Sequence, residues 1–163
     1  MAIWQFVIIL VPKDWAMEAD FNPSSLYESD GYETKVAWKN RQPPTNFKNL
    51  MSKILPPAKS WNDALLCWGD EKENDIQVGY ENNAVADIQF RLALHTQFKP
   101  LLPKLIEVAN ELNCVLFFPE LGLISIASET VLLELIQRSR AARFVSDPRK
   151  CLDGFQNGTQ QAI

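Results

Sequence analysis

Residues 84–94 of this 163-residue chain read AVADIQFRLAL, and their alternation decides the fold. One parity is apolar throughout: Ala84, Ala86, Ile88, Phe90, Leu92 and Leu94. The other parity is mostly polar: Val85, Asp87, Gln89, Arg91 and Ala93. A period of two with one apolar face is typical of a strand that buries one face in an antiparallel sheet. The stretch therefore predicts a sheet within an α+β domain.

Further strands are expected on both sides of this stretch in the chain. Ala64–Trp68 is apolar, and alternating apolar residues follow at Ile76, Val78 and Tyr80. With short polar turns between them, these segments predict a three-stranded meander from about residue 64 to residue 94. The run Ile3–Val11 is nearly continuous in apolar residues, which predicts a strand buried on both faces near the sheet centre.

Three shorter strands and a long connection are predicted for other segments of the chain. Cys114–Phe118 and Leu123–Ile126 predict two strands, and Tyr32–Trp38 predicts a short one. Lys13–Glu33 contains many turn residues and predicts a long, loop-rich connection.

Three segments have the apolar spacing of amphipathic helices. They are 46–55 after Thr45, Pro100–Asn113, and Glu129–Arg143 after the N-cap residue Ser128. The chain is thus predicted to be α+β, with a mostly antiparallel sheet that includes the meander and about three helices packed on it. We expect one domain over residues 1–155 and a flexible tail at 156–163.

Net charge narrows the class of partner. The chain carries −4, and the imbalance lies in residues 1–90, which hold 13 acids against 8 bases. Binding to nucleic acid requires clustered Lys and Arg, so the acidic balance argues against nucleic acid. It fits either a basic protein partner or a charge that serves solubility alone. The apolar run at 3–11 is too short to span a bilayer and lacks the basic start of a signal peptide. We therefore expect no membrane association and a cytoplasmic location.

The residue types that carry most enzyme chemistry are sparse. His95 is the only histidine, and the cysteines Cys67, Cys114 and Cys151 form no CxxC pair. This favours a reducing compartment and argues against a thiol enzyme, a structural metal or a disulfide framework. No glycine-rich phosphate loop is present among the six glycines. The sequence predicts no catalytic residues, no metal and no cofactor.

Five short segments resemble a group of small uncharacterised bacterial proteins. They are WQF at 4–6, LPPAKSW at 55–61, CWGD at 67–70, DIQFRL at 87–92 and SRAARFVSDP at 139–148. The resemblance spans residue 4 to about residue 155. Its general style, a small acidic α+β domain, is similar to immunity proteins of bacterial polymorphic toxin systems, which implies binding and no catalysis.

We therefore expect a non-enzymatic protein-binding module, and specifically a toxin-neutralising immunity protein that acts by occlusion. Two acidic segments are the candidate partner-binding residues: Asp14, Glu18, Asp20, Glu28, Asp30 and Glu33 in the first loop, and Asp70, Glu71, Glu73 and Asp75 at the hairpin tip. Two alternatives stay open at this point. One is a small enzyme whose site is not visible in sequence, and the other is a homo-oligomeric module that pairs through the polar strand face at Val85, Asp87, Gln89 and Arg91.

Overall fold

A computed structural model describes residues 2–147 of the chain. A seven-stranded sheet has the order β4-β5-β6-β7-β1-β8-β9, and every neighbouring pair is antiparallel. Its strands are β1 (Gln5–Pro12), β4 (Pro57–Ala58), β5 (Leu65–Gly69), β6 (Asp75–Glu81), β7 (Ala84–Ala93), β8 (Cys114–Phe118) and β9 (Leu123–Ser125). A separate two-stranded hairpin comprises β2 (Tyr27–Glu28) and β3 (Gly31–Tyr32). The predicted meander is confirmed as β5, β6 and β7.

Six α-helices accompany the sheet in the described part of the chain, more than the three predicted. They are α1 (Lys13–Glu18), α2 (Lys35–Trp38), α3 (Phe47–Ser52), α4 (Leu101–Glu111), α5 (Glu129–Gln137) and α6 (Arg140–Ser146), with a 3-10 turn at Ser24–Leu26. The expected α+β class is confirmed. The predicted tail at 156–163 lies outside the described residues.

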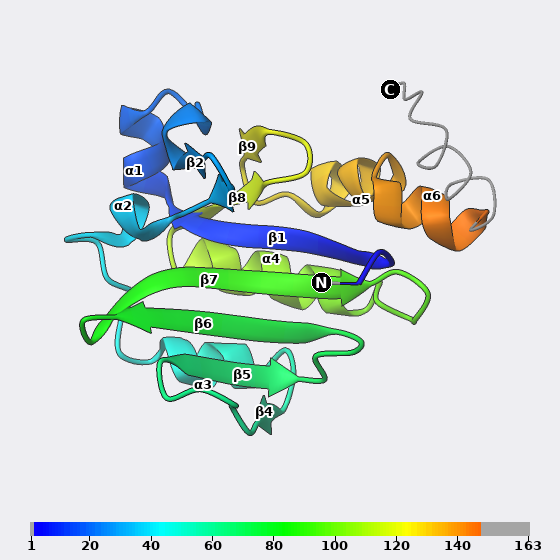
Figure 1. Cartoon of the computed structure of the whole chain (residues 1–163), viewed down its shortest axis with the longest axis horizontal. Coiled ribbons are helices and arrows are strands. Elements are labelled where there is room, and N and C mark those ends of the chain that lie inside the picture. The colour runs from blue at the N-terminus through cyan, green and yellow to red at the C-terminus, as the bar shows by residue number, and fades with distance from the viewer. Residues whose placement is uncertain (1, 148–163) are drawn as a thin grey trace.

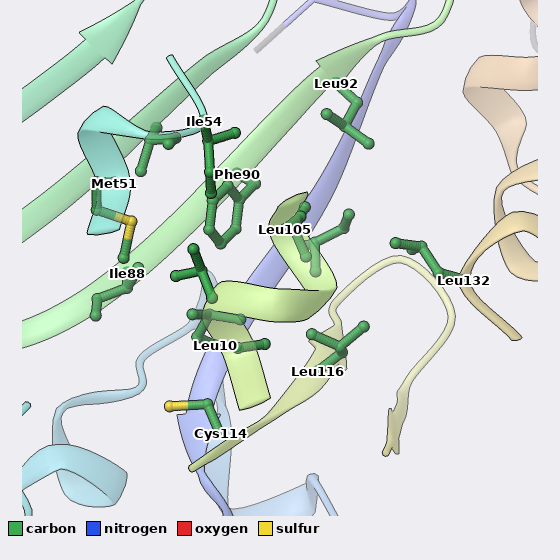
Figure 2. Close-up of a cluster of buried hydrophobic side chains, with 14 of the residues drawn as sticks. Leu10, Met51, Ile54, Ile88, Phe90, Leu92, Leu105, Cys114, Leu116 and Leu132 are labelled. Carbon is green, nitrogen blue, oxygen red and sulfur yellow. The ribbon is translucent and has the colours of Figure 1, made fainter. Parts of the chain in front are cut away.

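The larger core lies between one face of the sheet and the helices α3, α4, α5 and α6. In Figure 1, α3 and α4 lie behind the strands β5, β6 and β7. Figure 2 shows apolar side chains from these helices and strands gathered together: Met51, Ile54, Leu105 and Leu132 with Leu10, Ile88, Phe90, Leu92 and Leu116. The apolar parity of residues 88–94 points into this core, as its alternation predicts.

A smaller core lies on the opposite face of the sheet and covers only part of it. Ile9 and Val11 of β1 and Val115 and Phe117 of β8 pack there beneath Trp15 of α1 and other apolar residues of segment 16–37. Because β1 contributes to both cores and lies between β7 and β8, the prediction of an interior strand buried on both faces is confirmed.

Three local predictions were wrong. Residues 35–38, expected in a short strand, form the helix α2, and the supposedly loop-rich segment 13–33 contains α1 and the β2–β3 hairpin. The helix expected over 129–143 is divided at Ser139, which is fully buried. The Ser139 hydroxyl accepts a hydrogen bond from Ala142 N and donates one to Ile136 O, so the residue caps α6 and ends α5.

Val85 also departs from its predicted place, because β7 changes register against β6 between Gly79 and Tyr80. The irregularity turns Val85 into the larger core, where it is 4% exposed. The predicted polar parity therefore begins at Asp87.

At the start of β7, side chains supply the hydrogen bonds that a neighbouring strand would otherwise make. The pairing of β1 with β7 ends at Ile88, so Val85 and Ala86 have no β1 partner. Gln42 accepts from Val85 N at 2.7 Å and donates to Val85 O at 3.0 Å, while Thr34 Oγ donates to Ala86 O at 3.0 Å. Buried main-chain groups need such partners, so the segment containing α2 is attached to the sheet by these bonds.

We predict that Gln42→Ala lowers the free energy of unfolding by about 2 kcal/mol, because it leaves the buried amide and carbonyl of Val85 unpaired. Urea denaturation monitored by far-UV circular dichroism measures the change. The matched control is Gln97→Ala, at an exposed glutamine. Equal stabilities of the two variants would contradict the role of Gln42.

Candidate functional site

The candidate site is a polar surface on the side of the sheet opposite the larger core. We call it the polar face, and it consists of Cys67 on β5, Asp75 and Gln77 on β6, and Asp87, Gln89 and Arg91 on β7. The strand register places Asp75 beside Arg91, and it aligns Cys67, Gln77 and Gln89 in one row across the strands. Six polar or sulfur-containing side chains thus gather on three neighbouring strands.

The view in Figure 1 looks onto this side of the sheet. α1, α2 and the β2–β3 hairpin lie at one end, near the start of β7, while β5 and β6 have no helix in front of them. Within residues 2–147, helices of the larger core cover one face of the sheet, whereas on the opposite face α1 and α2 cover only the end near the start of β7 and leave β5 and β6 without a helix in front.

A chain of hydrogen bonds runs along the polar face from the β2–β3 hairpin to Asp75. The Tyr32 hydroxyl donates to Gln89 Oε1 at 3.5 Å, and Gln89 Nε2 donates to Gln77 Oε1 at 3.0 Å. Gln77 Nε2 then donates to Asp75 Oδ2 at 3.2 Å. Every link donates toward the carboxylate, so each bond polarises the next and the side chains are held in one arrangement.

The chain ends at a buried ion pair. Arg91 Nε donates to Asp75 Oδ1 at 2.7 Å, and Arg91 Nη2 donates to Asp75 Oδ2 at 2.5 Å. The side chains of Arg91 and Asp75 are 13% and 2% exposed. Its hydrogen bonds to the Asp75 carboxylate raise the pKa of Arg91, and the two charges neutralise each other.

Asp75 was predicted to lie among the partner-binding acids of the hairpin tip, but it lies within β6 and its carboxylate is occupied by Arg91 and Gln77. Sequence reasoning did not find the Asp75–Arg91 pair. A signal was present, because Asp75 and Gln77 alternate with Ile76 and Val78 just as Gln89 and Arg91 alternate with Phe90 and Leu92.

Asp87 is the unneutralised carboxyl group of the polar face. It lies over Gly79, where a Cβ atom would collide with Asp87 Oδ1, and the Gly79 backbone donates a hydrogen bond to it. Burial, together with the nearby charge of Glu33, raises the pKa of Asp87 to about 6. Among the described residues, no Lys or Arg forms a salt bridge with Asp87.

The two predicted acidic segments lie at opposite ends of the sheet. Figure 1 shows α1 and β2 at the left and the β5–β6 connection at the right. Eight of the ten acids are exposed: Asp14, Glu18, Asp20, Glu28, Asp30, Asp70, Glu71 and Glu73. Glu33 is half-buried near Asp87, and Glu18 is paired with Arg41. The structure therefore does not bring the two segments into one patch.

The β5–β6 connection is hydrogen-bonded to β1. Gln5 Nε2 donates to the main-chain oxygens of Glu71 and Glu73, at 3.2 and 2.7 Å. Asn74 Oδ1 also accepts from Ala93 N at 2.7 Å. These bonds hold the loop in place, so Glu71 and Glu73 are presented at one end of the polar face while Glu33 and Asp87 lie at the other.

A cavity of about 580 Å³ adjoins the polar face at the end where the β2–β3 hairpin lies. It lies between α2 and the start of β7, and Glu28, Glu33, Lys35, Lys39 and Gln42 are among its lining residues. Lys35 is paired with Glu81 at 2.8 Å across its rim. Charges of both signs line this cavity, so it selects no single ligand charge.

His95 and the described cysteines do not form a catalytic pair. His95 packs edge-on against Trp4, with ring centroids 5.4 Å apart. Cys114 is buried in the larger core, and burial raises its thiol pKa to about 12, while burial also raises the thiol pKa of Cys67 on the polar face. These pKa shifts disfavour the reactive thiolate of both cysteines. Cys151 lies outside the described residues.

Residues 2–147 contain neither a metal-binding cluster nor a membrane-spanning helix. No three His, Cys, Asp or Glu side chains are grouped closely enough to bind a metal ion. No helix in that part of the chain has the length and apolar character needed to cross a membrane.

Comparison of the chain with protein-family models, with curated proteins and with solved structures finds no match. The resemblance to small bacterial proteins and to immunity proteins therefore stays a prediction. The polar face is the structural feature on which a functional conclusion can rest.

We predict that Asp75→Ala lowers the free energy of unfolding by about 2–3 kcal/mol, because it leaves the half-buried Arg91 guanidinium without a counter-charge. Chemical denaturation measures the loss. The double variant Asp75→Leu with Arg91→Met removes both charges and is expected to lose much less stability. A double variant as unstable as the single one would show that the pair does not act as a unit.

The Asp87 carboxyl predicts a stability that depends on pH. The folded state holds the Asp87 proton up to about pH 6, above the ordinary value of 3.8, so this stabilising contribution is complete below pH 3.8 and is lost as the pH rises through 6. Asp87→Asn removes the charge and should raise the free energy of unfolding by about 1 kcal/mol at pH 8, with little change at pH 4. Thermal denaturation at both pH values measures the difference in stability, and Asp63→Asn at an exposed position is the control. A D87N protein that is less stable than the wild type at pH 8 would contradict the prediction.

Proposed function

We propose that this protein is a non-enzymatic protein-binding module that neutralises a basic protein partner by occlusion, in the manner of an immunity protein acting on its toxin. The observation that carries the proposal is the polar face, an ordered set of polar side chains in front of whose strands β5 and β6 no helix of residues 2–147 lies. Binding surfaces benefit from such order, because side chains that are already held lose little conformational entropy when a partner docks.

The charge around the polar face favours a basic partner. The Asp75 and Arg91 charges cancel, which leaves the Glu33 and Asp87 carboxyls at one end and those of Asp70, Glu71 and Glu73 at the other. Lys72 is the cation within the second group. Near the first group, Lys35 is paired with Glu81, and Lys39 lines the adjoining cavity with Glu28 and Glu33. An excess of negative charge at both ends attracts a cationic surface and accelerates the encounter.

Occlusion means that this protein inhibits its partner by covering the partner's basic surface. A partner that lies across β5, β6 and β7 would have its own basic surface covered by the sheet, and no bond in either protein would need to be made or broken. Nucleases and other toxins that act on polyanions use basic clefts, so a cover of this kind would inhibit them without catalysis.

A small acid–base enzyme is the second candidate. Asp87, with a pKa raised to about 6, is a carboxyl suited to proton transfer, and Tyr32 lies nearby on the same face. A binding module inhibits its partner only in proportion to the complex that it forms. An enzyme, in contrast, turns over substrate in excess of its own concentration. An inhibition assay at substoichiometric protein therefore separates the two functions.

Charge reversal tests the proposed function. We predict that Glu71→Lys with Glu73→Lys lowers the affinity for the partner captured from native cells by about tenfold or more at low ionic strength, and that it weakens the salt dependence of binding. Surface plasmon resonance at several salt concentrations measures both effects.

The matched control makes the same charge change on the other side of the sheet. Glu107→Lys with Glu111→Lys alters two exposed acids of α4 and should leave affinity unchanged. Equal losses from the two double variants would show that net charge matters and the polar face does not. Failure of the wild-type protein to retain any stoichiometric basic partner would overturn the proposed function.

A further inference from the structure

Trp61 is the most exposed of the large hydrophobic side chains that the structure leaves at the surface. It is 71% exposed, whereas Trp15, Trp38 and Trp68 are at most 8% exposed. Trp4 is half-buried against His95 and Phe144. Four of the five tryptophans therefore serve the fold, and Trp61 contributes nothing to either core.

The loop that presents Trp61 is held by hydrogen bonds of its own. Ser60 Oγ donates to Asn62 O at 2.6 Å, and Asn62 O also accepts from Leu65 N at 3.1 Å. Asn62 Oδ1 accepts from Ala64 N at 2.8 Å. The main chain on both sides of Trp61 is thus fixed, so the indole is displayed by an ordered turn that leads directly into β5.

This loop adjoins the polar face. The residue before Trp61, Ser60, lies close enough to Cys67 of the polar face to influence the pKa of its thiol. β4 and β5 pair at Ala58 and Cys67, which places the loop at the outer edge of the sheet. An exposed indole therefore lies beside an ordered polar surface flanked by carboxylates.

On the basis of the proposed function, we infer that Trp61 is the apolar anchor of the partner interface. The partner is a different protein, with an apolar pocket that receives the indole and a basic surface beside it that faces the polar face. Tryptophan is enriched among the residues that dominate interface energetics, where it fills a pocket from which water is excluded. The negative charge around the polar face fits a basic partner and disfavours a second copy of this acidic chain.

Site-specific photo-crosslinking in native cells tests this inference. A photoreactive benzophenone amino acid replaces Trp61, Glu73 or exposed Glu107 in three separate full-length proteins. We expect positions 61 and 73 to form an adduct with the same basic protein after irradiation, and position 107 on α4 to form none.

Each other outcome is decisive. An adduct at 73 without one at 61 overturns the Trp61 anchor and leaves the proposed function standing. An adduct at 61 without one at 73 supports a Trp61 docking site and counts against the acidic polar face as the interface. A covalent dimer of the chain, equal labelling at all three positions, or no adduct at all overturns the inference.

The partner that crosslinking identifies can then be purified, and its affinity for variants of this protein gives a second test. Trp61→Ala is expected to weaken binding by about 30-fold or more, with Trp61→Phe in between. The control Ile126→Ala removes another exposed apolar side chain, 57% exposed just after β9, and should leave affinity unchanged. Acrylamide should quench Trp61 preferentially in the free protein, and partner binding should remove that component. An unchanged affinity of W61A would overturn the inference even if a crosslink forms.

Discussion

The two-residue period of the strand β7 governs the rest of the structure. Its apolar parity must face α3, α4 and α5 to build the larger core, so Asp87, Gln89 and Arg91 are placed on the opposite side of the sheet. A one-residue slip against β6 would bring charged groups into the core. The polar face is therefore a direct consequence of the register that buries Ile88, Phe90 and Leu92.

The polar face is stable because its members supply one another with hydrogen bonds. Asp75 and Arg91 neutralise each other, and Gln77 and Gln89 continue the chain of bonds to Tyr32. Burying any one of these groups alone would be costly, whereas the connected set is satisfied. Asp87 is different, since its charge faces Glu33 and no Lys or Arg of residues 2–147 forms a salt bridge with it. The surface is thus ordered and still carries an electrostatic imbalance that an external cation could relieve.

Two segments outside the meander limit and orient this surface. The segment containing α2 is bound to the start of β7 through Gln42 and Thr34, and the β5–β6 loop is bound to β1 through Gln5. Because both segments are attached to the sheet by buried or half-buried hydrogen bonds, the main chain that carries their acidic residues keeps a fixed relation to the polar face. The Ser60–Ala64 turn places Trp61 at the remaining edge in the same ordered way.

The sequence alone was sufficient for the elements whose pattern is local. The alternation of residues 84–94, the apolar run that forms β1 and the helical spacing of α4 predicted those elements, because each buries a face that its own periodicity defines. Tertiary structure decided the rest. The helix α2, the turn of Val85 into the core, the pairing of Asp75 with Arg91 and the exposure of Trp61 all depend on segments distant in the chain. A single sequence carries no record of which distant groups will meet, so the polar face became visible only once the strands were aligned.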